Sequence, residues 1–349
     1  MAQSPYPYSQ VGLPGTLLTP DLLPEITNTW EIGTELGFFN NRLLLDATYY
    51  YSLAKNQIMP VTLPKSTGYS NKRLNSGELQ NTGIELQLDA AILELSSGFN
   101  WNSVLTYTKN NSYVKSIHPD LETITLNSAW DAKIQATPGE EYGQIVGYDY
   151  KRDEQGRLLV NDLGHPVQGE LSVFGSINPD YLFGFRNTFT YKGITLSVLI
   201  DGTMGSEIYS WGKTYKMLWG TDVETLEGRQ EWFDTHDDRG RPLPDVEPGG
   251  YIFEGIVEST GQPNDIPLSD PAYRGYIPYN NKVIDGSVMD ASSIRIREAY
   301  ISYTFPNSLI NKLKMTNLTL TATGRNLFFF YKPADHIDPE AGYSSGNTG

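Results

Sequence analysis

The chain contains 349 residues, carries a formal net charge of −15 and has no cysteine. The lack of cysteine excludes a disulfide framework and thiolate chemistry, and the acidic charge argues against nucleic acid or an anionic membrane surface as a partner. No apolar run approaches the ~20 residues of a membrane-spanning helix, but a mean hydropathy of −0.39 does not exclude membrane strands, because only their alternate residues meet lipid.

Residues 1–8, Met-Ala-Gln-Ser-Pro-Tyr-Pro-Tyr, lack the basic and apolar regions of a signal peptide. Two explanations fit this start: a cytosolic chain, or a part of a longer exported polypeptide. The strand pattern that follows favours the second.

The first predicted hairpin spans residues 30–51. Apolar side chains lie on one face of its first strand and polar or small ones on the other: Trp30, Ile32, Leu36 and Phe38 against Glu31, Gly33, Glu35 and Gly37. After a turn at 39–42 the alternation resumes: Leu45 and Tyr49 lie on one face of the second strand, and Asp46 and Thr48 lie on the other. Period-two alternation is typical of half-buried strands, and two such runs across an Asn-Asn turn predict a hairpin.

Three further strand pairs follow, at 79–92 with 99–107, at 181–191 with 194–200, and at 292–305 with 315–331. In the first of these pairs we expect one apolar face on the strand 79–92: Leu79, Ile84, Leu86, Leu88, Ala90 and Ile92. The run 292–305 changes phase near Arg297-Glu298, which predicts a β-bulge.

The links between strands alternate in length. Within each pair the link is short (39–42, 94–97, 191–193 and 306–314), and between pairs it is long (56–77, 112–180 and 206–290). Short turns at one end and long loops at the other are typical of a transmembrane β-barrel. We therefore predict an all-β fold, a partial antiparallel transmembrane barrel with short periplasmic turns, long extracellular loops and no helical domain.

Two alternatives come from other classes of protein. A soluble, secreted β-sandwich that binds carbohydrate would show the same alternation, although its strands and loops are usually shorter. A β-rich glycoside hydrolase needs two carboxylates across a cleft, and no such pair is singled out. Solubility without detergent would distinguish the sandwich from the barrel.

Two sets of residues are candidates for function. If the fold is a barrel, charge must avoid lipid, so six carboxylates are predicted to line the lumen, as a polar wall along a substrate path or merely to keep it wet: Glu31, Glu35, Asp46, Glu85, Asp89 and Asp201. Aromatic residues of the long loops could contact a sugar substrate or a partner protein, or pack the loops: Trp130, Tyr142, Trp211, Trp219, Trp232 and Tyr251. The loop 206–290, the longest, is the favoured contact for such a partner.

Catalytic and metal-binding patterns are missing from the sequence. Four histidines without cysteine exclude the usual zinc spacing, and the acidic run 234–245 lacks the order of a calcium loop. No nucleophile elbow, phosphate loop or dinucleotide fingerprint occurs. We expect no enzyme activity, no catalytic residue, no metal and no cofactor.

Several segments resemble the SusC/RagA-type TonB-dependent outer-membrane transporters. They include "NSGELQNTGIELQL", "GQIVGYDYKRDEQGRLLVN", "MDASSIRIREAYISYTFP" and "LTLTATGRNLFFF", and they occur in family order over residues 19–341. The resemblance implies a barrel in the bacterial outer membrane, closed around an N-terminal plug and capped by a SusD-like lipoprotein. It also implies energised import of glycans, or in some members peptides, driven by the TonB complex.

The chain departs from that family pattern at both ends. Nothing in it resembles the plug, the TonB-contacting segment or the first barrel strands, and no closing strand follows the run 315–331. We therefore interpret residues 1–349 as the C-terminal part of such a transporter, which could not transport anything by itself.

Overall fold

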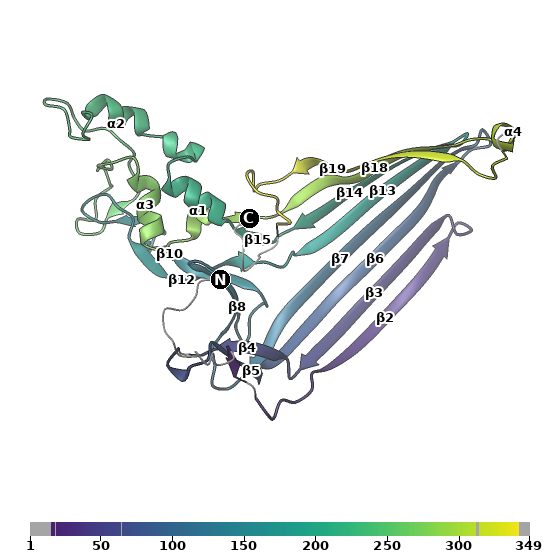
Figure 1. The fold of residues 1–349 in the computed structure, drawn as a ribbon, viewed down its shortest axis with the longest axis horizontal. Coiled ribbons are helices and arrows are strands. Elements are labelled where there is room, and N and C mark those ends of the chain that lie inside the picture. The colour runs from purple at the N-terminus through teal and green to yellow at the C-terminus, as the bar shows by residue number, and fades with distance from the viewer. Residues whose placement is uncertain (1–14, 18, 64, 312–313, 342–349) are drawn as a thin grey trace, which may run out of the picture.

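The main feature of the structure, a computed structural model that describes residues 15–17, 19–63, 65–311 and 314–341, is one long antiparallel sheet of eight strands (Figure 1). In the order of their pairing the strands are β19 (Thr319–Tyr331), β18 (Ser293–Thr304), β14 (Ile194–Met204), β13 (Tyr181–Tyr191), β7 (Phe99–Ile117), β6 (Gly77–Glu94), β3 (Leu43–Lys55) and β2 (Ile26–Phe38). The four predicted hairpins are confirmed. The sheet stays open, with β2 and β19 at its edges.

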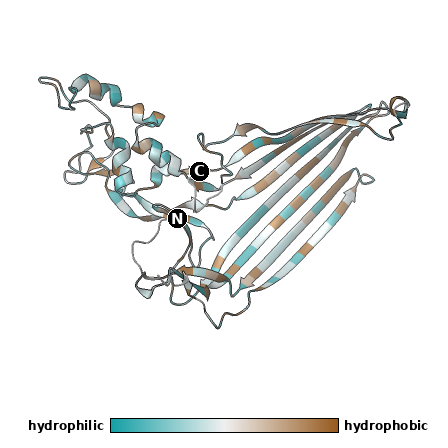
Figure 2. Ribbon diagram, in the orientation of Figure 1, coloured by the Kyte–Doolittle hydropathy of each residue, from teal (hydrophilic) through white to brown (hydrophobic). Residues whose placement is uncertain are grey.

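The strand register sorts side chains onto two faces. One row of paired residues crosses all eight strands and is entirely apolar: Leu36, Leu45, Leu88, Leu105, Phe185, Ile200, Ile296 and Phe328. The neighbouring row points the other way and is mostly polar: Glu35, Asp46, Gln87, Thr106, Gly184, Asp201, Arg295 and Phe329. Figure 2 shows the same alternation of hydrophobic and hydrophilic residues along the strands. We call these two sides of the sheet the apolar face and the polar face.

Among the described residues, no second layer of protein covers the apolar face. Ile32 is 72% exposed and Leu196 is 41% exposed. The clusters of fully buried apolar residues lie elsewhere, at the ends of the strands and in the long links. A soluble sandwich would instead bury this face against a second sheet.

The alternation of side chains between the two faces has a bulge in β18 and an unexpected apolar residue in β6. The predicted bulge is confirmed: Leu199 pairs with Glu298 while Ile200 pairs with Ile296, so Arg297 is the extra residue. The predicted direction of Leu79 is wrong, because β6 pairs without interruption from Leu79 to Ala91 and Leu79 therefore shares the polar face with its odd-numbered neighbours. There it packs beside Val114, where folded loop residues cover the sheet end.

The short links all lie at one end of the sheet and the long ones at the other (Figure 1). Phe39, Asn40 and Asn41 all have positive φ in the first turn, and the Lys192-Gly193 turn does as well. The fourth short link carries one helical turn, α4 (Asn307–Ile310). This arrangement confirms the predicted separation of turns and loops.

The first two long links form small sheets of their own. Link 56–76 contributes β4 (Ile58–Thr62), the 3-10 helix η1 (Lys65–Thr67) and β5 (Asn71–Asn75). Strands β4 and β5 form a three-stranded sheet with β1 (Thr16–Leu17). Link 118–180 contributes β8 (Ile124–Ala129), β9 (Ala132–Ala136), β10 (Gln144–Tyr150), β11 (Leu159–Val160) and β12 (Gln168–Ser176). Strands β12, β10, β9 and β8 pair into a four-stranded sheet.

The third long link is partly helical, which the sequence pattern did not predict. It contains β15 (Glu207–Tyr209), α1 (Trp211–Leu218), η2 (Val223–Leu226), α2 (Arg229–Thr235), β16 (Ile256–Val257), α3 (Tyr273–Asn280), η3 (Asp285–Ser287) and β17 (Val288–Asp290). The longest of these helices has eight residues. Within the described part of the chain, no helix has the length and apolar character needed to cross a bilayer.

Candidate functional site in the long loops

Four aromatic rings from three separate segments meet in the loops. Trp130, at the β8–β9 turn, lies parallel to Trp211 with 4.2 Å between ring centroids. Trp211 opens α1 behind the N-cap Ser210, whose Oγ accepts a hydrogen bond from the backbone N–H of Lys213. The rings of Tyr215 and Tyr279 lie 4.5 and 6.1 Å from that of Trp211. We call these four residues the aromatic stack; Trp130, at its outer end, is 59% exposed.

A cavity of about 160 Å³ lies between α1 and α3, next to the inner end of the aromatic stack. Its wall includes side chains from β10, α1, η2, α3 and the segment between α2 and β16: Tyr150, Thr214, Met217, Glu224, Tyr251, Phe253, Arg274 and Tyr279. Gly275 permits the close approach of the two helices, since a Cβ there would overlap the carbonyl oxygen of Met217. The cavity is thus a gap framed by tightly packed helices.

The cavity contains one buried cation. Arg274 is 9% exposed, and its guanidinium lies 3.7 Å from the centroid of the Tyr251 ring. Its Nη1 lies 3.2 Å from Oε2 of Glu227, yet no hydrogen bond of good geometry reaches that atom. Glu224, which also lines the cavity, forms an ion pair with Lys213. Burial raises the pKa of Tyr150, so its hydroxyl stays protonated in the physiological range.

A second charged group lies where β18 and β19 leave the sheet for the loops. Arg295 is only 2% exposed and pairs with Asp201 and Glu340, while its guanidinium lies over the ring of Phe329. Arg297, the bulge residue, also joins Asp201 to Glu340. The hydrogen bonds from Arg297 hold the pKa of Glu340 down at about 2. These contacts tie the segment 332–341 to the polar face.

All six predicted lumen carboxylates lie on the polar face. Glu35 and Asp46 are paired directly across β2 and β3, a like-charge contact that costs stability. Asp201 differs from the others because it is neutralised by Arg295 and Arg297. The sequence analysis missed both arginines, although their place in a run that changes phase was the available signal.

The predicted aromatic contacts divide into two groups. Trp130, Trp211 and Tyr251 belong to the aromatic stack or the cavity, and Trp219 is 71% exposed at the end of α1. Trp232 packs inside the loop: it is 9% exposed, stacks on His236 and donates a hydrogen bond to the carbonyl oxygen of Ser269. Tyr142 also packs inward, as described next.

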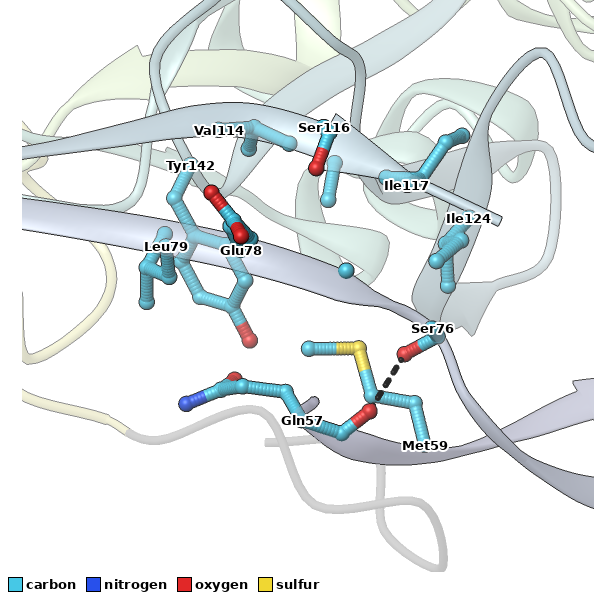
Figure 3. A pocket seen from close by; sticks show the side chains of 12 residues that line it. Gln57, Met59, Ser76, Glu78, Leu79, Val114, Ser116, Ile117, Ile124 and Tyr142 are labelled. Carbon is cyan, nitrogen blue, oxygen red and sulfur yellow. Dashed lines mark hydrogen bonds between the residues drawn. The ribbon is translucent and has the colours of Figure 1, made fainter. Parts of the chain in front are cut away.

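Tyr142 lines a small apolar gap of about 10 Å³ between β4, β6, β7 and β8 (Figure 3). In that view Met59 points into the gap, and Oγ of Ser76 donates a hydrogen bond to the carbonyl oxygen of Gln57 at 3.0 Å. A cavity needs at least ~10–15 Å³ to hold a water molecule. This gap is therefore a packing feature that joins the first two loop sheets to the strand ends.

The described residues contain no group of three or more His, Asp or Glu side chains placed to hold a metal ion. The acidic run 234–245 instead forms a hairpin closed by Asp237 and Arg241. The hydrogen bond from the Arg241 side chain lowers the pKa of Asp237 to about 2. The same local pairing closes the turn from Asp153 to Arg157.

Comparison with known proteins gives consistent matches. The profile of the TonB dependent receptor-like β-barrel family matches residues 2–198. TonB-dependent receptor P26 of Formosa agariphila is 26% identical, over 97% of this chain and 33% of its own length. TonB-dependent receptor SusC of Bacteroides thetaiotaomicron is 22% identical, over 53% of this chain and 20% of its own length.

Among solved structures, the RagAB peptide transporter superimposes with a TM-score of 0.62 at 18% identity, over 91% of this chain and 33% of that one. Its 'open-open' state gives a TM-score of 0.61 at 19% identity, over 93% of this chain and 33% of that one. At this identity the likeness shows the fold. The chain spans about a third of the length of the full-chain relatives it matches.

Proposed function

This chain belongs to the TonB-dependent receptor-like β-barrel family, and we propose that it forms part of the wall and outer loops of an outer-membrane importer for glycans. A SusD-like surface lipoprotein would cover the loops. The plug and the TonB contact would come from sequence outside these 349 residues.

The apolar row across all eight strands carries this proposal. In that row Leu36, Leu105, Phe185 and Phe328 are 38% to 58% exposed although they are apolar, and the other four residues are half-buried. The polar face gathers the carboxylates. Lipid covers such a face at no cost, and charges on the lipid side would cost ~2–4 kcal/mol for a basic residue at the midplane. A bilayer accounts for both faces, with the polar face turned to the lumen.

The aromatic stack and the cavity support a glycan as the substrate. Flat aromatic rings suit the C–H faces of sugars, and the neighbouring charged groups suit their hydroxyls. The RagAB importers carry peptides, so a peptide is the competing substrate.

Exposed apolar side chains on the third loop support the lid partner. Four such side chains occur between the end of α1 and the middle of α2 and are 58% to 76% exposed: Trp219, Val223, Leu226 and Phe233. Exposed apolar patches of this kind mark docking sites for partners, and aromatic residues are common anchors of such interfaces. We call these four residues the loop patch.

Uptake by cells that carry the complete receptor and its lipoprotein tests the substrate and the energy source. We expect a fluorescent neutral oligosaccharide to enter, and we expect entry to stop when TonB is deleted. A labelled peptide of similar mass is the matched probe. Uptake of the peptide alone would overturn the glycan proposal, and uptake that persists without TonB would overturn the energised mechanism.

Charge placed in the loop patch tests the lid. Trp219→Asp combined with Phe233→Asp should lower the amount of co-purified lipoprotein roughly tenfold or more, because each substitution removes an apolar anchor and buries a charge. Leu309→Asp is the control, since Leu309 is also exposed, at 50%, but lies in α4 at the opposite end of the sheet. Equal lipoprotein recovery from both variants would contradict this assignment.

A further inference from the structure

We propose that the cavity between α1 and α3 is a subsite for a single neutral sugar ring, with Arg274 as its principal hydrogen-bond donor. The inference rests on the proposed import of glycans and adds where, and through which groups, one ring of the substrate is held. The cavity lies in the loop layer beyond the strand ends, where α1 and α3 meet (Figure 1).

The size of the cavity matches one ring. A cavity of roughly 150 Å³ is sufficient to bind benzene, and this one measures about 160 Å³. It opens to solvent on one side, so substituents of a pyranose ring, or the next sugar along a chain, can extend outward. Its aromatic lining comes from Tyr150, Tyr251, Phe253 and Tyr279.

Arg274 supplies a donor without a well-placed acceptor. The residue is more than nine-tenths buried, and its Nη1 is buried without a hydrogen bond. The nearby Glu227 carboxylate is itself largely exposed and offers only an ion-pair contact at 3.2 Å. Buried donors in native proteins nearly always have a hydrogen-bond acceptor. A ligand hydroxyl in the cavity would accept the hydrogen bond that Nη1 of Arg274 does not make within the protein.

The charge in the cavity wall favours a neutral ligand. Besides Arg274 the lining contains one carboxylate, Glu224, whose partner Lys213 also pairs with Asp222 at 3.1 Å. One cation and one anion in the lining suit a group that both donates and accepts hydrogen bonds. A sugar hydroxyl does both, whereas an acidic sugar would bring a second carboxylate toward Glu224.

The side chains and helices that line the cavity are held in place by contacts within the protein. The guanidinium is fixed over Tyr251, and α3 is held against α1 at Gly275. The backbone N–H of Val283 donates to the carbonyl oxygen of Pro278 at 2.9 Å, which closes the end of α3. Such prior ordering lowers the entropic cost of binding.

Gly286 offers a way to block the cavity without removing any contact. It lines the cavity, and a Cβ added there meets no atom within 4 Å. We expect Gly286→Leu, in membranes that carry the complete receptor, to reduce binding of methyl glycosides of glucose, mannose, galactose and xylose at least tenfold, measured by saturation-transfer NMR. Gly15→Leu is the matched control, because Gly15 also has open space around its Cβ but lies away from the cavity.

Arg274→Lys tests the donor. A lysine keeps the charge but cannot reproduce the planar fork, and loss of a hydrogen bond from a charged group weakens binding roughly tenfold or more. The expected result is weaker binding of at least one of these glycosides, with methyl glucuronide bound more weakly than methyl glucoside by the unaltered protein.

The outcomes separate this inference from the import proposal. If both variants bind the glycosides as the unaltered protein does while oligosaccharide uptake continues, the subsite is wrong and glycan import stands. If the protein takes up only peptides, glycan import fails and the subsite fails with it. Tighter binding of glucuronide than of glucoside would overturn the neutral-ligand assignment.

Discussion

Arg297 does two things at the scale of one residue. As the extra residue of the bulge it leaves the regular pairing of β18 with β14, and this frees its side chain to join Asp201 to Glu340. Arg297 donates from Nη1 to Oε2 of Glu340 at 3.1 Å and also to Oδ1 of Asn326 at 3.3 Å. One side chain thus holds the segment after β19 against the polar face.

This contact should depend on pH. The Glu340 carboxyl has a pKa of about 2, below the ordinary ~4.3 of glutamate. The stabilisation that it provides is therefore complete above that ordinary value and is lost as the pH falls from there toward 2. Hydrogen exchange of residues 335–341, corrected for its intrinsic pH dependence, should show protection unchanged from pH 7 to pH 5 and reduced at pH 3.

The matched variants separate the Glu340 contact from a general effect of acid. Glu340→Gln should already reduce that protection at pH 7, roughly tenfold, because the pair is partly exposed and screened. Asp335→Asn alters a nearby carboxyl of the same segment and should leave the pH profile unchanged. A protection profile for Glu340→Gln that matches the unaltered protein would show that Glu340 does not hold the segment.

Not every candidate site residue could be identified from the sequence. Trp130 and Trp211 stand out as loop aromatics, but their contact joins residues that are 81 positions apart (130 and 211). No comparable signal marks Arg274, because its burial depends on Tyr251 and on the packing of α3 against α1. Trp232 is a loop tryptophan like Trp130, but its side chain is buried whereas that of Trp130 is exposed. Residue type alone does not distinguish a surface ring from a packed one.

At the scale of elements, the alternation of apolar and polar residues predicted which segments form the strands of the large sheet. The period of two fixes which residues share a face, and the short links fix which strands pair. It failed at Leu79, where folded loop residues bury an apolar side chain on the polar face. It also could not predict the loops, because contacts such as the parallel pairing of β11 with β16 join distant segments with no periodic signal.

The bulge in β18 gives a prediction for a whole strand. Deletion of Arg297 would remove the extra residue and shift residues 293–296 by one position, which turns Arg295 toward the apolar face. An arginine facing lipid costs up to ~2–4 kcal/mol at the midplane and less near the strand ends. The shift would also break the ion pairs of Arg295 with Asp201 and Glu340, so we expect the deletion to impair assembly. Assembly is measured on a gel with membrane-extracted protein, because a folded barrel migrates differently before and after heating.

Arg297→Ala is the control for the deletion. It keeps the residue count and therefore the register, and it removes only the ion pairs with Asp201 and Glu340. We expect this variant to assemble with some loss of stability. If the deletion assembled as well as Arg297→Ala, the bulge would not be what sets the faces of β18.

At the scale of the whole molecule, the buried apolar clusters lie in and next to the loops. In the part of the chain that the structure describes, no protein layer covers the apolar face of the large sheet. Val160, Phe253, Val257, Leu268 and Ile277 form one such cluster in the loop layer. The sheet also ends in two edges, β2 and β19, and unpaired edges invite further strands. Both features follow if the sheet is a section of a larger closed wall in a membrane.

Two neighbouring positions on β3 test that account most directly. Leu45 belongs to the apolar row and Asp46 to the adjacent polar row. Leu45→Arg should impair assembly in the outer membrane, because it places a charge on the face that lipid covers, at a cost that reaches ~2–4 kcal/mol at the midplane and falls toward the strand ends. Asp46→Arg should assemble normally, since it replaces a like-charge contact with Glu35 by an opposite-charge one. Membrane fractionation with a heat-modifiability gel measures both, and normal assembly of Leu45→Arg would mean that lipid does not cover this face.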